Sequence, residues 1–250
     1  MKNNMNNNKL GVIILAAGKG TRMKSSLPKV LHKVLGETMI SRVVSQAKNV
    51  GAKKIVVVVG YKKELVIDEL KNKDVEFAIQ SEQLGTGHAI KMAKDKFTSW
   101  DGNVLILSGD VPLLTTATIE KLIEKHNKEK ADATVLSAIF SDPTGYGRII
   151  RTKDDTYSHS VEEKDANYDV KKIKEINAGI YIFKLKHLFH YLRFINNDNT
   201  QNEYYLTGVL PLMVKDEKKI VLQVANDPNE IRGINTIQQL KDAKNKLRRI

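Results

Sequence analysis

A glycine-containing loop at residues 15–23 follows the first apolar segment of the sequence, 12–15. That segment has the length and β-branched content of a buried parallel strand. Two glycines in the loop allow a tight turn that brings backbone N–H groups close to a ligand. Positive charge lies beside them on Lys19, Arg22 and Lys29. The loop is consistent both with a phosphate-binding site and with an ordinary turn after a strand, because its spacing matches neither the Walker A motif nor the dinucleotide fingerprint.

A second candidate for chemistry is Asp110, which follows the most uniformly apolar segment after the first, 104–107. Ligands bind outside the carboxyl ends of the strands in an open parallel sheet, so we expect this carboxylate and the glycine loop to face one crevice. A phosphate loop with one carboxylate favours magnesium, which prefers hard oxygen ligands and keeps substrate phosphates in its shell. A simple turn at 108–112 is the alternative, because glycine, aspartate and proline are ordinary turn residues.

A third candidate is the polar loop at residues 80–88. The side-chain amide of Gln80 can both donate and accept hydrogen bonds, which recognition of the edge of a pyrimidine such as uracil requires. Thr86 lies where it can also serve simply as the cap of a following helix. His126, in contrast, falls on the apolar stripe of an expected helix, and we expect it to pack rather than to bind a ligand.

The elements that must position these residues alternate between strands and helices over the first half of the sequence. Short apolar segments predict strands at 12–15, 54–59, 75–79 and 104–107. Apolar residues at helical spacing predict helices at 39–50, 65–70, 86–97 and 115–126. This alternation predicts a mostly parallel sheet with helices on both of its faces.

The second half of the sequence has strand-like segments that no long helix separates. These segments lie at 133–140, 147–151, 157–161 and 176–183. They are followed by expected helices at 185–194 and 203–215, a strand at 220–224 and a basic helix at 236–249. Pro211 is expected to end or kink the helix at 203–215. We therefore expect an α/β, Rossmann-like fold with a mostly parallel or mixed twisted sheet and helices on both faces.

Composition limits the classes of protein that the sequence can encode. The chain has 250 residues, 41% of them hydrophobic, which suits one large α/β domain, and its apolar runs are far shorter than a membrane span. Residues 1–17 imitate a signal peptide only weakly, and the absence of cysteine excludes disulfides, so we expect a cytoplasmic protein. The net charge of +12 suits nucleic acid or an anionic substrate, but the lysines lie among Glu and Asp, which favours solvated helix faces.

Seven segments of the sequence resemble, in order and approximate spacing, the successive motifs of the uridyltransferase half of the bifunctional GlmU family. They are LAAGKGTRM at 15–23, LPKVLH at 27–32, EQLGTGHA at 82–89, GDVPL at 109–113, DPTGYGRI at 142–149, EINAG at 175–179 and NEYYLT at 202–207. The resemblance implies the nucleotide-diphospho-sugar transferase fold. It also implies a reaction in which UTP and N-acetylglucosamine 1-phosphate give UDP-N-acetylglucosamine and pyrophosphate.

The resemblance also implies a role for each matching position. The residues whose backbone would hold the uridine and its phosphates are Leu15, Ala16, Ala17 and Gly18. Those that would complete recognition of the base are Gln80, Gly85 and Thr86. Arg22 and Lys29 would neutralise the triphosphate, and Asp110 would hold Mg²⁺ together with Asn235. The residues that would line the N-acetylglucosamine pocket are Gly147, Glu162, Asn177 and Tyr205, with Ser108 next to it.

The sequence departs from the family pattern at four positions. Ser108 stands where tyrosine is common, Ala178 where threonine is frequent, Glu163 where histidine is frequent, and Gly208 where aspartate follows the last motif. These differences bear on substrate preference. They leave open a related sugar-1-phosphate nucleotidyltransferase that uses another sugar or nucleotide. A basic nucleic-acid-binding protein and a catalytically silent sugar-nucleotide sensor are more distant alternatives.

The expected domain organisation is simple. It comprises a disordered, asparagine-rich segment at 1–9, a nucleotidyltransferase domain at 10–235 and a linker-like helix at 236–250. No hexapeptide repeat is present, so we do not expect the β-helix trimerisation domain of the family or its acetyltransferase activity in this chain. The expected partners are Mg²⁺, the two substrates and the two products, with no nucleic acid and no membrane.

Overall fold

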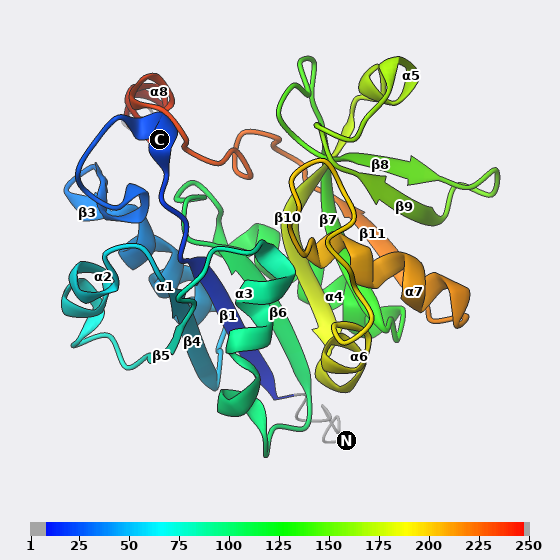
Figure 1. Cartoon of the computed structure of the whole chain (residues 1–250), viewed down its shortest axis with the longest axis horizontal. Helices are drawn as coiled ribbons and strands as arrows, with labels where there is room; N and C mark the ends of the chain where they lie inside the picture. The colour runs from blue at the N-terminus through cyan, green and yellow to red at the C-terminus, as the bar shows by residue number, and fades with distance from the viewer. Residues whose placement is uncertain (1–8, 248–250) are drawn as a thin grey trace, which may run out of the picture.

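The computed structural model describes residues 9–247. Most of the segment 1–9, and residues 248–249 of the expected terminal helix, lie outside the described residues. Among the helices of the described range, none is long and apolar enough to cross a membrane. The centre of the fold is a nine-stranded sheet whose main path runs β11-β7-β10-β6-β1-β4-β5, with β8 and β9 joined to β10 (Figure 1).

Most strands of the sheet point the same way. The strands that share this direction are β1 (Leu10–Ala16), β4 (Lys54–Val59), β5 (Glu76–Ile79), β6 (Asn103–Ser108), β7 (Ala133–Ile139) and β11 (Ile220–Val224). In the parallel ladders of β1, Ile14 lies opposite Val57 on one side and Leu107 on the other. The carboxyl ends of β1 and β6 therefore meet at the same edge, as the site requires.

β10 (Glu175–Lys184) runs against this direction between β6 and β7. Its amino end therefore lies at the edge where β1 and β6 end, and there it also pairs with β8 (Arg148–Arg151). β8 continues into an antiparallel pair with β9 (Tyr157–Val161). The expected mixed sheet is confirmed, and the reversed strand brings the 175–179 segment to the carboxyl-end edge.

Helices cover both faces of the sheet, as expected. One face carries α1 (Met39–Asn49), α2 (Lys63–Leu70) and α4 (Thr116–Lys128), and the other carries α3 (Thr86–Met92), α6 (Leu185–Tyr191) and α7 (Val209–Lys215). Val12 and Ile14 pack in the first core and Ile13 in the second, because successive side chains of a strand point to opposite faces. His126 packs as expected: it is buried, its Nδ1 lies 2.8 Å from Thr134 Oγ1, and burial lowers its pKa to about 4.

The remaining short elements lie at the edges of the fold. They are the 3-10 turns η1 (Thr21–Met23), η2 (Lys29–Leu31), η3 (Lys94–Phe97) and η4 (Leu206–Gly208), the hairpin β2 (Lys33–Val34) and β3 (Glu37–Thr38), and the helices α5 (Tyr168–Lys171) and α8 (Ile237–Leu247). α8 and the β8–β9 pair stand on opposite sides of the carboxyl-end edge (Figure 1). α8 and the β8–β9 pair therefore flank the candidate site.

A third, smaller core anchors the glycine loop. Met23, at the position where a dinucleotide fingerprint has its third glycine, is buried against Val34 and Met39. Leu240 and Ala243 of α8 belong to the same core. The terminal helix is thus packed against the loop that opens the site. That residues 236–250 form a linker-like helix separate from the 10–235 domain remains a prediction.

The prediction of a helix at 203–215 is wrong for the first half of this range. α7 begins only at Val209, so Pro211 lies in its first turn and neither ends nor kinks it. Backbone N–H groups of a first helical turn have no partner within the helix, which makes proline acceptable there. Tyr204 is instead extended: its N–H donates to the Leu84 carbonyl at 2.8 Å, and its carbonyl accepts from the Gly87 N–H at 2.7 Å.

Candidate active site

Two adjoining cavities open at the carboxyl ends of β1 and β6. They share Leu15, Thr86, Ser108 and Asp110 in their walls, so they form one crevice. One cavity, which we call the base-side cavity after the role expected for Gln80, adds Ala16, Ala17, Gly18, Lys29, Gln80 and Gly85. The other, which we call the sugar-side cavity after the role expected for Asn177, adds Gly147, Glu162, Asn177 and Asn235. Segments separated by more than two hundred residues in the sequence thus meet around Asp110.

The glycine loop fixes the position of Lys29. Gly20 has φ +61°, a backbone conformation that favours glycine, and a Cβ on it would lie 2.5 Å from Lys29 Cβ. The side-chain stem of Lys29 therefore lies directly against the loop, and its ammonium extends to Asp110. The loop is a support for a catalytic candidate as well as a lining of the cavity.

Four polar side chains meet at the junction of the two cavities. Lys29 Nζ contacts Asp110 Oδ2 and donates to Asn235 Oδ1 at 2.9 Å. Arg22 Nη2 donates to the same Asn235 oxygen at 2.9 Å. The Ile234 N–H donates to the Asp110 carbonyl at 2.9 Å, which ties the 233–235 segment to the end of β6. The two basic side chains expected to neutralise the triphosphate and the two oxygen-bearing side chains expected to hold Mg²⁺ thus form one cluster.

The donor set of this cluster suits magnesium. One carboxylate oxygen of Asp110 and one amide oxygen of Asn235 converge on a single cation, the Lys29 ammonium. Hard oxygens are the ligands that Mg²⁺ prefers, and it often takes only one or two protein ligands when a nucleotide supplies the rest. Among the described residues, no group of three or more His, Cys, Asp or Glu side chains offers an alternative metal site.

A capping box at the start of α8 supports Asn235. Gln239 Oε1 accepts from the backbone N–H of Asn235 at 2.7 Å and of Thr236 at 3.1 Å, and Thr236 Oγ1 accepts from the Gln239 N–H. Reciprocal bonds of this kind fix the first turn of a helix. Sequence reasoning missed Gln239, although Thr-x-x-Gln before an apolar stripe is the signal for such a cap.

The base-side wall is built on Gln80 and Gly85. Gln80 is buried, and its Nε2 lies 3.1 Å from the Gly85 carbonyl and 3.1 Å from His88 Nδ1. Gly85 has φ +105°, and a Cβ on it would lie 2.7 Å from the Tyr204 carbonyl. The loop and the extended 203–205 segment therefore pack backbone to backbone.

The sugar-side wall is built on Glu162, Asn177 and Gly147. Glu162 Oε1 accepts from Thr207 Oγ1 at 3.1 Å, and a Cβ on Gly147 would lie 3.2 Å from Glu162 Oε2. The Asn177 N–H donates to the Gly147 carbonyl at 2.9 Å, and Asn177 Oδ1 accepts from the Gly179 N–H at 2.9 Å. The wall thus presents carboxylate and amide groups held in place by the backbone, which suits hydroxyl and amide groups of a ligand.

Replacing Glu162 by glutamine should raise the melting temperature near neutral pH. Burial raises the pKa of the Glu162 carboxyl above its ordinary 4.5, the hydrogen bond from Thr207 opposes this, and nearby Asp165 and Glu203 add to it. A carboxyl whose pKa is higher in the folded state takes up a proton on folding, so its ionised form lowers stability at higher pH. The gain in melting temperature should vanish below about pH 4, where this carboxyl is protonated in both the folded and the unfolded state. Melting curves from about pH 3 to 8 test this, and a gain independent of pH would contradict it.

Two predicted residues lie outside the crevice walls. Arg22 is exposed and reaches the junction only through Asn235. Tyr205 lines a neighbouring cavity behind Glu162 and Thr207, where its hydroxyl accepts from Gln201 Nε2 at 2.8 Å. Tyr205 is thus separated from the sugar-side cavity by that wall, and its assignment remains a prediction.

Sequence reasoning also missed several residues of the sugar-side wall. Tyr146 and Thr207 line this cavity, and both lie within quoted motifs that could have identified them. Behind them, the fully buried Arg148 pairs with Glu163 at 2.8 Å and donates to the Tyr146 carbonyl. Glu163, where the family frequently has histidine, therefore supports the wall indirectly, through its ion pair with Arg148.

Fold and crevice together define an α/β protein with a glycine loop and a two-part crevice at the carboxyl edge of its sheet. A family model described as nucleotidyl transferase matches residues 11–229, and the chain belongs to this family. The chain is 48% identical over 237 residues to the bifunctional protein GlmU of Streptococcus uberis, an alignment that covers 95% of this chain and 52% of that protein. It is 46% identical over 245 residues to GlmU of Syntrophotalea carbinolica, covering 98% and 53%. The chain spans about half the length of the curated relatives it matches.

Solved structures of low sequence identity share the fold. A UDP-glucose pyrophosphorylase complexed with UDP-glucose superposes with a TM-score of 0.75 at 18% identity, covering 96% of this chain and 98% of that one. HddC from Yersinia pseudotuberculosis, complexed with GMP-PN, gives 0.68 at 23% identity, covering 95% and 99%. The Rossmann-like α/β fold expected from the sequence is thereby confirmed.

Proposed function

We propose that the chain transfers a uridylyl group from UTP to N-acetylglucosamine 1-phosphate and releases pyrophosphate. The observation that carries the proposal is the position of the Lys29–Asp110–Asn235 cluster, between the base-side and sugar-side cavities. A nucleotide in one cavity and a sugar phosphate in the other would bring both phosphates to this cluster. The identity of about 48% to GlmU supports the choice of uridine and N-acetylglucosamine.

Catalysis in this proposal is positioning and charge stabilisation. The sugar-phosphate oxygen attacks the α-phosphorus of UTP, the bond to the pyrophosphate oxygen breaks in line with it, and pyrophosphate leaves. Lys29 and Arg22 hold the two anions together and stabilise charge on the transferring and leaving oxygens. The crevice walls contain neither a cysteine nor a serine–histidine pair among the described residues, in keeping with direct displacement.

Asp110 and Asn235 would hold the magnesium ion. The ion, when bound, would supply additional positive charge to the nucleotide phosphates. Because the Lys29 ammonium contacts the same two oxygens, it would release them when the metal binds and then be free to contact phosphate. Glu162, Asn177 and the backbone at Gly147 would orient the N-acetylglucosamine.

Gln239→Ala is expected to weaken metal binding, because it removes the acceptor that holds the Asn235 backbone. Gln239→Glu keeps the acceptor oxygen and is the matched control. The affinity for Mn²⁺ in the presence of UTP, measured by electron paramagnetic resonance, should fall about threefold or more in the alanine variant and remain close to wild type in the glutamate variant. Equal affinities of the wild type and the alanine variant would contradict the supporting role.

A panel of substrates tests the proposed function against its alternative. Ser108 lines both cavities and lacks the aromatic ring common at this position, which keeps a different sugar phosphate or nucleotide as the second candidate. Pyrophosphate release is measured with four nucleoside triphosphates and with the 1-phosphates of N-acetylglucosamine, N-acetylgalactosamine and glucose. The highest kcat/KM should belong to UTP with N-acetylglucosamine 1-phosphate. A higher value for another pair would establish the alternative.

A further inference from the structure

We propose that His88, together with the Gly85 carbonyl, determines which hydrogen-bonding group Gln80 presents to the nucleobase, and so sets the preference for uracil over cytosine. This inference rests on the proposed function in one respect, since it takes the base-side cavity as the place where the base of a nucleotide binds. His88 lies in α3 and has no role in the reaction described above. Its test is made on nucleotide binding, which requires no turnover.

The orientation of the Gln80 amide follows from its partners. The backbone carbonyl of Gly85 can only accept a hydrogen bond, so the amide atom 3.1 Å away from it is the nitrogen. His88 Nδ1 lies 3.1 Å from the same nitrogen and must accept its other proton. The imidazole is therefore neutral and carries its proton on Nε2.

Both protons of Gln80 Nε2 are then used within the protein. An amide nitrogen has two protons, and the two acceptors, the Gly85 carbonyl and His88 Nδ1, take one each. Only Gln80 Oε1 remains to face a ligand, and an amide oxygen can only accept. Gln80 thus presents a single type of group to the base, an acceptor.

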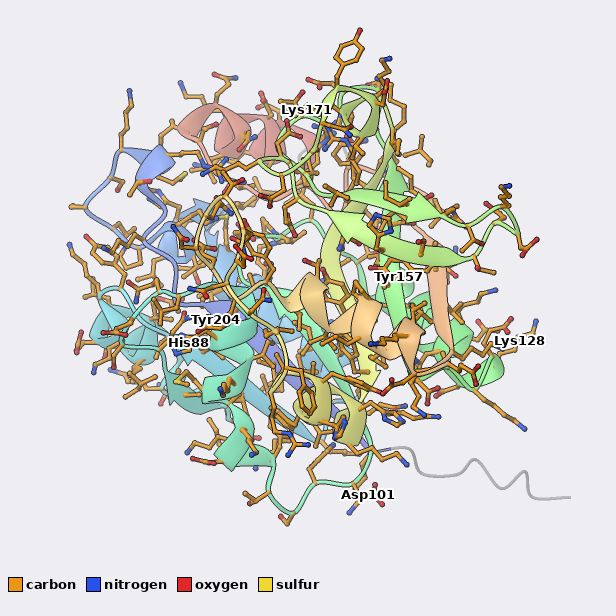
Figure 2. The ribbon with its side chains drawn as sticks, turned by 45° about the vertical axis from the view of Figure 1, so that its right-hand side comes forward. His88, Asp101, Lys128, Tyr157, Lys171 and Tyr204 are labelled. Atoms are coloured by element: carbon orange, nitrogen blue, oxygen red, sulfur yellow. The ribbon has the colours of Figure 1, made fainter. Side chains whose placement is uncertain are left out.

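The backbone of Gln80 is held in place, so its side chain starts from a fixed position. Gln80 is only 3% exposed, its N–H donates to the Val59 carbonyl at 2.8 Å, and Gln83 Nε2 donates to its carbonyl at 3.1 Å. His88 lies beside Tyr204. The backbone of Tyr204 forms hydrogen bonds with Leu84 and Gly87, the residues on either side of the Gly85–Thr86 pair. In Figure 2, His88 on α3 lies close to Tyr204 on the neighbouring 203–205 segment.

An acceptor at this position distinguishes the two pyrimidines. Ring nitrogen N3 carries a proton in uracil and a lone pair in cytosine, so Gln80 Oε1 attracts the first and repels the second. Without His88 Nδ1, only the Gly85 carbonyl holds the amide, which can then rotate and offer Nε2 to the cytosine lone pair. A site that matches one hydrogen-bonding pattern rejects the other because a buried polar group is left unpaired.

The test compares His88→Phe with His88→Asn. Phenylalanine keeps the size of the ring without an acceptor, and the asparagine side-chain oxygen can replace Nδ1. Dissociation constants for UTP and CTP are measured by calorimetry on each variant of the 250-residue chain, with thermal melting to verify the fold and His88→Leu as a second variant without an acceptor. Wild type and His88→Asn should prefer UTP, and the ratio of the two constants should fall about tenfold or more in His88→Phe.

Two results would overturn the inference. One is an unchanged ratio in folded His88→Phe or His88→Leu. The other is an equal loss of preference in His88→Phe and His88→Asn, since the acceptor would then not be the group that matters. Failure of the proposed function gives a different result: selective binding of UTP by the wild type with no UDP-N-acetylglucosamine formed when the sugar phosphate is added.

Discussion

Asp110→Asn is expected to lower turnover by about three orders of magnitude or more while leaving the fold intact. The side chain is the one carboxylate at the junction of the two cavities among the described residues, and it contacts Lys29. Asparagine has nearly the same shape but removes the negative charge that would hold a divalent cation. Removal of a single preorganised charge from a reacting centre commonly costs at least two to three orders of magnitude in kcat. Steady-state release of pyrophosphate at saturating Mg²⁺ measures the effect.

The matched control for this variant is Asp101→Asn. Asp101, labelled in Figure 2, is exposed just before the amino end of β6. Asp110 follows the carboxyl end of the same strand. Asp101→Asn should have wild-type activity and a wild-type melting temperature. Near-normal activity of Asp110→Asn at saturating magnesium would contradict its assignment as metal ligand.

Lys29→Met is expected to change two quantities in opposite directions. Turnover should fall about a hundredfold or more, because the variant loses the ammonium that stabilises charge on the transferring phosphate. The affinity for Mn²⁺ without nucleotide should rise, because the Lys29 ammonium no longer competes for Asp110 Oδ2 and Asn235 Oδ1. Methionine keeps the length and most of the volume of the lysine side chain, so the support from Gly20 is preserved.

Lys24→Met is the control for the loss of one positive charge from this part of the chain. Lys24 is exposed at the end of η1 and lines neither cavity of the crevice. Both its turnover and its Mn²⁺ affinity should match those of the wild type. An unchanged or weakened Mn²⁺ affinity in Lys29→Met would show that the lysine does not compete with the metal.

The parallel half of the fold was predictable because its strands carry their own signal. Segments such as 55–59 and 104–107 are buried on both faces and are therefore apolar throughout, which identifies them without a structure. The hairpin of β2 and β3 has two-residue strands and no comparable pattern. The error at 203–215 arose because the extended 203–205 segment is stabilised by bonds to Leu84 and Gly87, which are distant in sequence.

The same distinction applies to the site. Asp110 and the glycine loop were found because each follows an obvious strand, and the geometry of an open sheet brings such ends together. Asn235 and Asn177 were identified only through the resemblance, since a lone asparagine has no pattern of its own. The contribution of His88 depends on a hydrogen bond to Gln80 and on the tautomer that this bond selects. Such a contribution cannot be read from residue types.

The most direct test of the proposed function is to incubate the purified chain with UTP, N-acetylglucosamine 1-phosphate and Mg²⁺ and to measure both products. UDP-N-acetylglucosamine, identified by mass spectrometry, and pyrophosphate should appear in equal amounts, and neither should form with Asp110→Asn. Pyrophosphate release without UDP-N-acetylglucosamine, or no reaction by a folded chain that binds UTP, would contradict the proposed function.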